Sequence, residues 1–430
     1  MINPTLIHPK RSNTVAKLAL MTGLASTLVV WGGQTYWPLA FSLVGVYLLV
    51  TKKQNILHDR RITTQRSWIH LIAVFLAYAC IRCMMYLYHG DRFNVEPLVP
   101  FLFFPFLAAA IIYTNIQQET FWKGIAIGGI LASALAAHQH FQLGIPRSYG
   151  FMNPIPFGDL CVAFSLVSIV GASGDGVGSR TSGLRLMLLI SAFCSAYGSL
   201  LSGTKGGWLS LAMVILFGCY RIYLRIEKPK RMIALMFMLS AMLAIGTFAP
   251  NHVGDRIKNG FIAGQEWIRT GEVTDGSVSI RLELWKFGFI LFKESPLTGV
   301  SLEQWRERRQ ELVTSGTLSP KILEIQTLDN EFIGNLAEGG IFSLMNTLLL
   351  IFGPLLIFRQ LSKTTGIKSK DLATVGVWIP IIFAEFGLST SLWGQSAFRQ
   401  IYVSWLVLLL AMITNTENQK INSNHLHSDS

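Results

Sequence analysis

Apolar runs separated by short polar segments follow one another along nearly the whole chain. An α-helix needs roughly 20 apolar residues to cross the ~30 Å hydrocarbon core of a bilayer. The pattern therefore predicts an all-α polytopic membrane protein with about twelve transmembrane helices. We place these spans at residues 15–31, 36–50, 68–88, 98–113, 124–137, 157–171, 186–201, 208–224, 232–249, 341–358, 372–389 and 401–413.

One connection differs in kind from the others. Residues 250–340 form a long loop with charges of both signs, and loops of this length are usually functional. The chain thus divides into residues 1–249 with nine spans, the long loop 250–340 with helices of its own, and residues 341–414 with three spans. A polar tail at residues 415–430 follows, and we expect it to be disordered.

Two helices are predicted inside the long loop. In "SIRLELWKFGFILFKESPLTG" the residues Leu282, Trp285, Phe289 and Phe292 recur at helical spacing, and the helix stops before Pro296. We expect this apolar stripe to lie on or against the membrane domain. The next segment, "SLEQWRERRQEL", predicts a more polar helix whose charges are most simply a solvated face.

The distribution of lysine and arginine predicts the orientation. Short basic loops remain cytoplasmic, and here they alternate onto one side, at residues 10–17, 52–66, 221–231 and 359–370. An even number of spans places both termini and the polar tail on that side. The long loop then lies on the non-cytoplasmic side.

Composition agrees with the membrane assignment and excludes two other classes. The chain of 430 residues is 51% hydrophobic and 14% charged, with a mean hydropathy of +0.44. The net charge of +12 is spread between the apolar runs and not gathered into a patch, so nucleic acid is not an expected partner. All five cysteines fall within predicted spans, which favours packing over a disulfide framework or a zinc site.

Five cations lie at or beside the non-cytoplasmic ends of spans, namely Arg82, Arg147, Lys205, Arg281 and Arg399. Taken singly, each has a simple alternative, because arginine can extend to the headgroups and lysine can occupy an ordinary turn. Together they indicate a cavity that holds an anion, since ionisable residues near lipid are costly and usually mark a substrate path. The glycines in "SGTKGGWLSL" permit close backbone approach, which favours Lys205 as a phosphate contact.

Other polar residues near the spans carry less information. Asp159 and Glu385 either pair with these cations or take part in chemistry, and the sequence leaves both alternatives open. The "HQH" segment at residues 138–140 holds an i, i+2 histidine pair that points to different faces of a helix. We therefore expect no metal and no cofactor, and protein cations would take the place of a metal beside a diphosphate.

Three sequence blocks resemble one known family. "SGTKGGWLSL", "IRLELWKFGFILFKESPLTGV" and "DNEFIGNLAEGGIFSL" are similar to the O-antigen ligase family, which shares a superfamily with the O-antigen polymerases. "RSYGFMNPIPFGD" looks like the stretch after the fifth span in that family. The resemblance covers residues from about 140 to 400, and the earlier spans match only in hydropathy.

The resemblance implies a membrane-embedded glycosyltransferase of the GT-C type. Such an enzyme transfers polysaccharide from undecaprenyl diphosphate to the lipid A core at the periplasmic face of the bacterial inner membrane, without a metal. A direct displacement of the diphosphate implies inversion at the anomeric carbon. The expected partners are the lipid-linked donor, the lipid A core acceptor and membrane lipid.

The resemblance also assigns roles to individual residues. Arg281 matches the family arginine that opens the loop helix, Arg147 matches the arginine after the fifth span, and Lys205 stands where an arginine is usual. We add Arg82 as a further contact to the diphosphate. Asp329 occupies the place of a family histidine near the acceptor hydroxyl, with Asn330 expected to help position the acceptor.

That aspartate is a departure from the family pattern, and Thr327 stands where some members have another histidine. A carboxylate can still serve as a general base, so we expect Asp329 and Arg281 to be the catalytic residues. The alternative is that position 329 has lost its role. A lysine at 205 keeps the charge but lacks the two-pronged donor geometry of arginine.

Other activities share these features. An O-antigen polymerase and a protein O-oligosaccharyltransferase use the same superfamily architecture, and local motifs do not separate them from a ligase. A transporter of lipid-linked glycans is the alternative outside enzymes. It would be expected to show internal repeats and broken helices near the bilayer midplane, and the sequence has no internal repeat.

Overall fold

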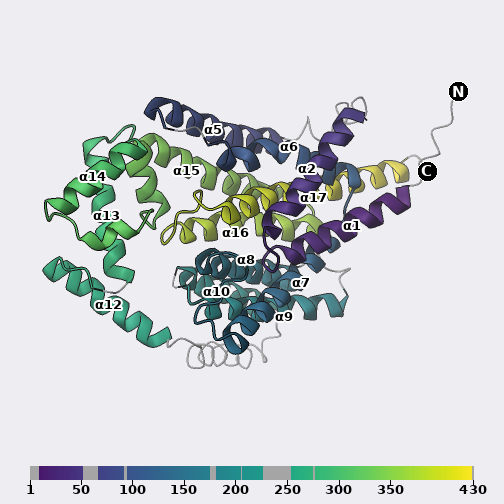
Figure 1. The fold of residues 1–430 in the computed structure, drawn as a ribbon. Coiled ribbons are helices and arrows are strands. Elements are labelled where there is room, and N and C mark those ends of the chain that lie inside the picture. Colours follow the sequence, from purple (N-terminus) through teal and green to yellow (C-terminus); the bar gives the residue numbers. More distant parts are fainter. Residues whose placement is uncertain are drawn as a thin grey trace.

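The computed structural model describes residues 9–51, 66–91, 94–174, 181–204, 206–225, 253–274 and 277–428. Within these ranges the chain forms helices and no strand (Figure 1). The helices are α1 (Pro9–Ser26), α2 (Gly33–Thr51), α5 (Arg66–His89), η1 (Glu96–Leu98), α6 (Val99–Thr114), α7 (Gln118–Ala137), η2 (His138–Gln142), α8 (Pro154–Ser173), α9 (Ser182–Ser202), α10 (Gly207–Arg225), α12 (Val253–Thr270), α13 (Ser277–Glu294), α14 (Leu302–Thr314), η3 (Pro320–Glu324), α15 (Glu331–Thr364), α16 (Ile367–Phe386) and α17 (Ser396–Ser428).

The predicted class, an all-α polytopic membrane protein, is confirmed. Seven of the described helices are long and apolar enough to cross a membrane, and two shorter apolar helices accompany them, Thr14–Ser26 and Gly207–Arg221. This is fewer than the twelve predicted spans. A helix stands at each predicted span among the described residues, but α2 and α16, although long enough, are not among the seven apolar spans. The predicted span 232–249 lies outside the described residues.

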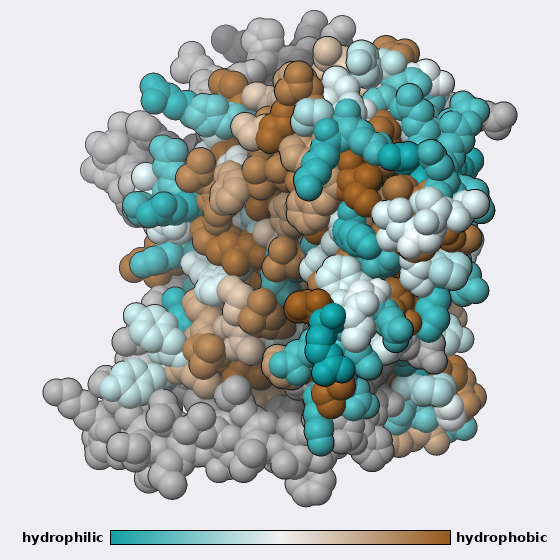
Figure 2. Space-filling view, turned by 90° about the vertical axis from the view of Figure 1, so that its left-hand side faces the viewer, coloured by the Kyte–Doolittle hydropathy of each residue, from teal (hydrophilic) through white to brown (hydrophobic). Residues whose placement is uncertain are grey.

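The helices form one bundle with α12–α14 at one end, and the start of α1 and the end of α17 at the other (Figure 1). Seen from the α12–α14 end, hydrophilic and hydrophobic residues alternate over the surface (Figure 2). The spans of α8 and α17 are 89% and 94% buried by protein, whereas that of α5 is 28% buried. The first two are therefore central helices, and α5 lies at the periphery.

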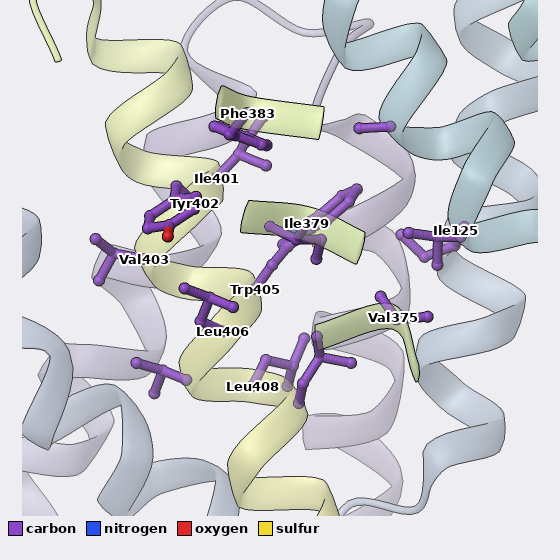
Figure 3. Close-up of a cluster of buried hydrophobic side chains, with 14 of the residues drawn as sticks. Ile125, Val375, Ile379, Phe383, Ile401, Tyr402, Val403, Trp405, Leu406 and Leu408 are labelled. Carbon is purple, nitrogen blue, oxygen red and sulfur yellow. The ribbon is translucent and has the colours of Figure 1, made fainter. Parts of the chain in front are cut away.

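The centre of the bundle is packed by large side chains from neighbouring helices. Ile379 and Phe383 of α16 face Tyr402 and Trp405 of α17, and all four are fully buried (Figure 3). The Tyr402 hydroxyl donates a hydrogen bond to the Leu350 carbonyl of α15 at 2.7 Å. Because a buried hydroxyl without a partner is costly, this bond fixes α17 against α15.

One expectation for the C-terminal part is wrong. The residues after Asn415 were expected to be disordered, yet α17 continues to Ser428. No glycine or proline interrupts this polar segment, so nothing in it breaks the helix. The Glu417 carboxylate accepts hydrogen bonds from the Ser369 hydroxyl at 2.6 Å and from the Gly366 amide at 3.2 Å, which holds α17 against the start of α16.

The long loop has a hydrophobic core of its own. α13, α14, η3 and the first turns of α15 enclose Leu284, Phe287 and Leu291, which are fully buried. Of the predicted apolar stripe of α13, Trp285 packs against this core, whereas Phe289 remains 46% exposed. The contact of the whole stripe with the membrane domain stays a prediction.

Two glycines join this loop core to α15. Both have a positive φ, +66° at Gly299 and +59° at Gly340, and Gly340 interrupts the helical geometry of α15. A Cβ atom at Gly340 would lie 2.3 Å from the Leu297 carbonyl group, and one at Gly299 would lie 2.3 Å from the Gly339 nitrogen. Only glycine fits where two backbones approach so closely.

Candidate functional site

Asp329 lies at the junction between the loop core and the membrane helices. It has a left-handed backbone with φ +48°, which is uncommon for a residue other than glycine and is tolerated best by Asp and Asn. The Thr327 hydroxyl donates a hydrogen bond to its Oδ1 atom at 2.9 Å. Arg281, near the start of α13, places Nε 3.7 Å from the other carboxylate oxygen, Oδ2. The two residues expected to be catalytic are thus brought together.

This pair is accessible from outside the protein. The side chains of Arg281 and Asp329 are 20% and 28% exposed. An exposed ion pair at 3.7 Å is weak. An incoming anion can therefore compete with Asp329 for the guanidinium.

Asn330 fixes the position of Asp329. Its Oδ1 atom accepts hydrogen bonds from the amides of Phe332 and Ile333 and so caps α15, while its Nδ2 donates to the Leu388 carbonyl. The side chain is 6% exposed. Because both ends of its amide group are bonded within the protein, Asn330 holds the neighbouring Asp329 in place, and its role toward an acceptor stays a prediction.

Glu331 anchors the same helix start from the other side. Its buried carboxylate accepts hydrogen bonds from the amides of Leu392 and Trp393 at 2.7 and 3.1 Å, and its own amide donates to the Gly387 carbonyl. The segment after α16 is therefore tied to the residues that carry Asp329. This anchoring role of Glu331 was not predicted, although the residue stands in the "DNEF" motif.

The "TKGG" turn also meets the segment after α16. A Cβ atom at Gly206 would lie 1.9 Å from the Ser389 hydroxyl oxygen, and one at Gly207 would lie 2.6 Å from Oδ1 of Asp159. These glycines permit close approach, as the motif predicted. Lys205 itself lies outside the described residues, and its role as a phosphate contact stays a prediction.

Arg147 lies against the same turn. Its Nε donates a hydrogen bond to the Ser202 carbonyl at 3.1 Å, and the amide of the adjacent Ser148 donates to the Leu201 carbonyl. Thr204 reaches the start of α8, where its hydroxyl donates to the Pro154 carbonyl at 2.8 Å. The "RSYG" segment and the "SGTKGG" segment therefore form one surface at the end of α9.

Gln139 holds the loop that carries Arg147. Only the histidines on either side of it were considered as candidates from the sequence. Gln139 is buried, accepts hydrogen bonds from the amides of Tyr149 and Gly150, and donates to the Gly150 carbonyl. A buried glutamine so fully paired fixes a loop in place. In the sequence, only its polar side chain at the end of an apolar helix could have indicated this role.

The two histidines make local contacts. In the π-helical turn η2, His138 is hydrogen-bonded to Gln142 at 2.6 Å, and His140 to the Ile145 carbonyl at 3.1 Å. Over the described residues, no three His, Cys, Asp or Glu side chains come together as a metal site would require.

Two carboxylates lie beneath this surface. Asp159 of α8 is fully buried, and neither of its carboxylate oxygens has a hydrogen-bond partner among the described residues. Glu385 of α16 accepts a short hydrogen bond from the Ser210 hydroxyl. Asp159 lies within electrostatic range of both Glu385 and Arg281, but neither acid forms an ion pair with a described cation.

The remaining two predicted cations have separate partners. Arg82 of α5 lies 3.9 Å from the Glu338 carboxylate and over the Tyr86 ring, at 5.4 Å from its centroid. Arg399 of α17 is buried and pairs with Glu96 at 2.5 Å. Arg281 thus pairs with Asp329, and Arg147 contacts the end of α9. The segment after α16 meets both regions, through Leu388 at Asn330 and Ser389 at Gly206, whereas Arg82 and Arg399 pair with glutamates elsewhere.

The fold and this site define a multi-pass membrane protein with a charged site at one end of its helix bundle. Residues 190–348 match the family model described as O-antigen ligase. The matched block contains Lys205, Arg281 and Asp329, whereas Arg147 and Arg82 precede it. Over this block the chain is similar to the O-antigen ligase family.

The chain is also similar to a protein of Haemophilus influenzae (strain ATCC 51907 / DSM 11121 / KW20 / Rd) that is described as an uncharacterized protein. The two are 21% identical over 378 residues, which cover 86% of this chain and 92% of that protein. The likeness extends well beyond the matched family block.

Proposed function

We propose that this protein is an O-antigen ligase, an inverting glycosyltransferase that transfers polysaccharide from undecaprenyl diphosphate to the lipid A core. The ion pair between Arg281 and Asp329 carries the proposal. It joins a cation suited to the donor diphosphate with a carboxylate suited to the acceptor hydroxyl. The match of residues 190–348 to the O-antigen ligase family model supports the enzyme class.

The cations act on the leaving group. Negative charge develops on the diphosphate as its bond to the anomeric carbon breaks, and preorganised cations in a site with little water stabilise that charge best. Arg281 supplies this charge together with Lys205 of the turn after α9 and with Arg147, which contacts the end of α9. These protein cations perform the role for which other transferases employ a metal.

Asp329 acts on the acceptor. When a diphosphate oxygen replaces Asp329 as the partner of Arg281, the carboxylate is released and accepts the proton of the acceptor hydroxyl. The hydroxyl oxygen bonds to the anomeric carbon from the side opposite the departing diphosphate, and undecaprenyl diphosphate leaves as the anion. The displacement inverts the anomeric configuration.

The membrane placement follows from the basic loops. Lysine and arginine in the short loops favour a cytoplasmic side at the end opposite α12–α14. The site then faces the periplasm from the inner membrane, where both lipid-linked substrates are present. The donor tail enters the site sideways from the bilayer.

A lipopolysaccharide gel tests this function. A deletion strain is complemented with wild type or with Asp329→Ala, and undecaprenyl-linked polymer is measured in parallel. We expect the deletion to leave bare core while linked polymer accumulates, and Asp329→Ala to fail in complementation. Core that carries a single repeat unit identifies a polymerase instead, and an unchanged ladder contradicts the assignment to this glycan.

A further inference from the structure

A cavity opens near the Arg281–Asp329 pair. It has a volume of about 1070 Å³ and lies between the end of α5, the start of α14 and the first turns of α15. We call it the α5–α14 groove and define it by Arg82, Tyr86, Trp305, Arg306, Gln326 and Glu338, which line it. The mechanism proposed above uses none of these residues.

The lining suits sugar hydroxyls better than a diphosphate. The partly exposed ring of Tyr86 stands beside planar polar groups of glutamine, arginine and glutamate. Rings of this kind offer an apolar face, and planar polar groups fix orientation by hydrogen bonds. The groove also holds four carboxylates against two arginines, with acids at Asp91, Glu303, Glu307 and Glu338, so it repels a polyanion.

Trp305 joins the groove to the hydrophobic core of the loop. It is 5% exposed, and its ring lies 5.3 Å from that of Phe287, with the Arg309 guanidinium 4.4 Å from its centroid. Trp305 therefore forms a rigid wall of the groove, and the polar groups open to a ligand are those of the exposed residues around it.

The groove reaches the proposed base. Gln326 lines it, and the next residue, Thr327, donates the hydrogen bond to Asp329. The groove shares no lining residue with the turn around Ser202 and Gly206. Figure 1 places α5 on one side of α15 and α16, and α8 and α10 on the other.

We propose that the α5–α14 groove binds the sugar residues of the oligosaccharide acceptor and presents its hydroxyl to Asp329. This inference rests on the proposed function. Displacement at an anomeric carbon needs the nucleophile opposite the leaving group. A groove across α15 and α16 from the phosphate-binding turn meets that requirement.

The test measures the Michaelis constants of both substrates with purified full-length protein in detergent. The probes are undecaprenyl-diphosphate-linked polysaccharide and lipid A core. Gln326→Ala and Arg306→Gln alter exposed residues of the groove. Gln310→Ala is the matched control, because Gln310 is an equally exposed glutamine on α14 that does not line the groove.

We expect each groove variant to raise KM for lipid A core about 5- to 10-fold, the usual effect of losing one hydrogen bond. KM for the donor should remain that of wild type in both groove variants. In Gln310→Ala, both Michaelis constants should remain those of wild type. Unchanged acceptor constants overturn the groove assignment while ligation stands. A raised donor KM overturns it too, because the groove then holds donor sugar.

Failure of the proposed function has a different signature. If wild type transfers nothing to lipid A core, the ligase proposal fails and the acceptor inference fails with it. The wild-type reaction therefore separates the two failures before any variant is compared.

Discussion

Arg281 and Arg399 look alike in the sequence, since both are cations predicted at the same end of the bundle, yet the structure uses them differently. Arg399 is 1% exposed, donates to the Trp393 carbonyl and pairs with Glu96 at 2.5 Å. The Arg281 side chain is 20% exposed, and its pair with Asp329 is 3.7 Å long.

The difference separates a structural cation from one that is open to a ligand. Arg399 links α17 to the helical turn before α6 and to the segment after α16. Its guanidinium is committed to the protein, and a substrate could reach it only by breaking buried bonds. Arg281 has an accessible surface and a weak partner. A cation available to a diphosphate is therefore recognised by its exposure and bond length, which the sequence does not record.

The largest effect is expected when Arg281, the exposed cation, is replaced. Arg281→Met should lower kcat/KM about 10²- to 10³-fold, because one preorganised group that stabilises developing charge contributes that much. Transfer rate and yield of folded protein are measured together. Arg308→Met is the matched control, since that arginine pairs only with Glu294 and Glu311 on the loop surface. Activity near wild type in Arg281→Met would remove Arg281 from the site.

The partner of Arg281 gives the second test. Asp329→Ala should lower kcat by about 10²-fold or more, the range for loss of a general base. Asp329→His should keep much of the activity, because imidazole is also a base and occupies this position in the family that the chain resembles. Single-turnover transfer measures both variants. If Asp329→His is as inactive as Asp329→Ala, the base assignment is wrong.

A smaller effect is expected at Lys205. Lys205→Arg should keep or improve donor binding, because a guanidinium can contact two phosphate oxygens at once. Lys205→Met should raise the donor KM about 10-fold. The two constants are compared in the same assay. If both variants have the same donor KM, Lys205 is a turn residue and does not contact the donor.

The smallest effect on activity is expected at the ion pair between Arg399 and Glu96. Glu96→Gln leaves Arg399 buried without a countercharge and should destabilise the protein by about 1–3 kcal/mol. Thermal unfolding in detergent should show a lower midpoint, while kcat of the folded fraction stays unchanged. A loss of donor affinity with normal stability would erase the distinction between the two arginines.

Much of this site could be predicted from sequence, because its motifs carry their own geometry. The glycines beside Lys205 indicated close approach, and the resemblance singled out Asp329 and Asn330, which lie at the start of α15. The pairing of Arg281 with Asp329 needed the family resemblance, since the two residues lie on separate elements.

The rest depends on partners that are distant in the chain. Nothing near Arg399 in the sequence points to Glu96, and nothing near Gln139 points to the loop at Tyr149. The buried face of α13 was also missed. Several of its faces are apolar, so periodicity could not tell which one the loop core would cover.

The junction of Gly299 and Gly340 has a consequence for sequence variation at these two positions. At most protein interfaces, a change on one side can be offset by a change on the other, because side chains exchange volume. Here backbone meets backbone, and neither side has an atom to give up. A smaller side chain elsewhere cannot make room at either position, so the join between the loop and the membrane helix depends on both glycines together.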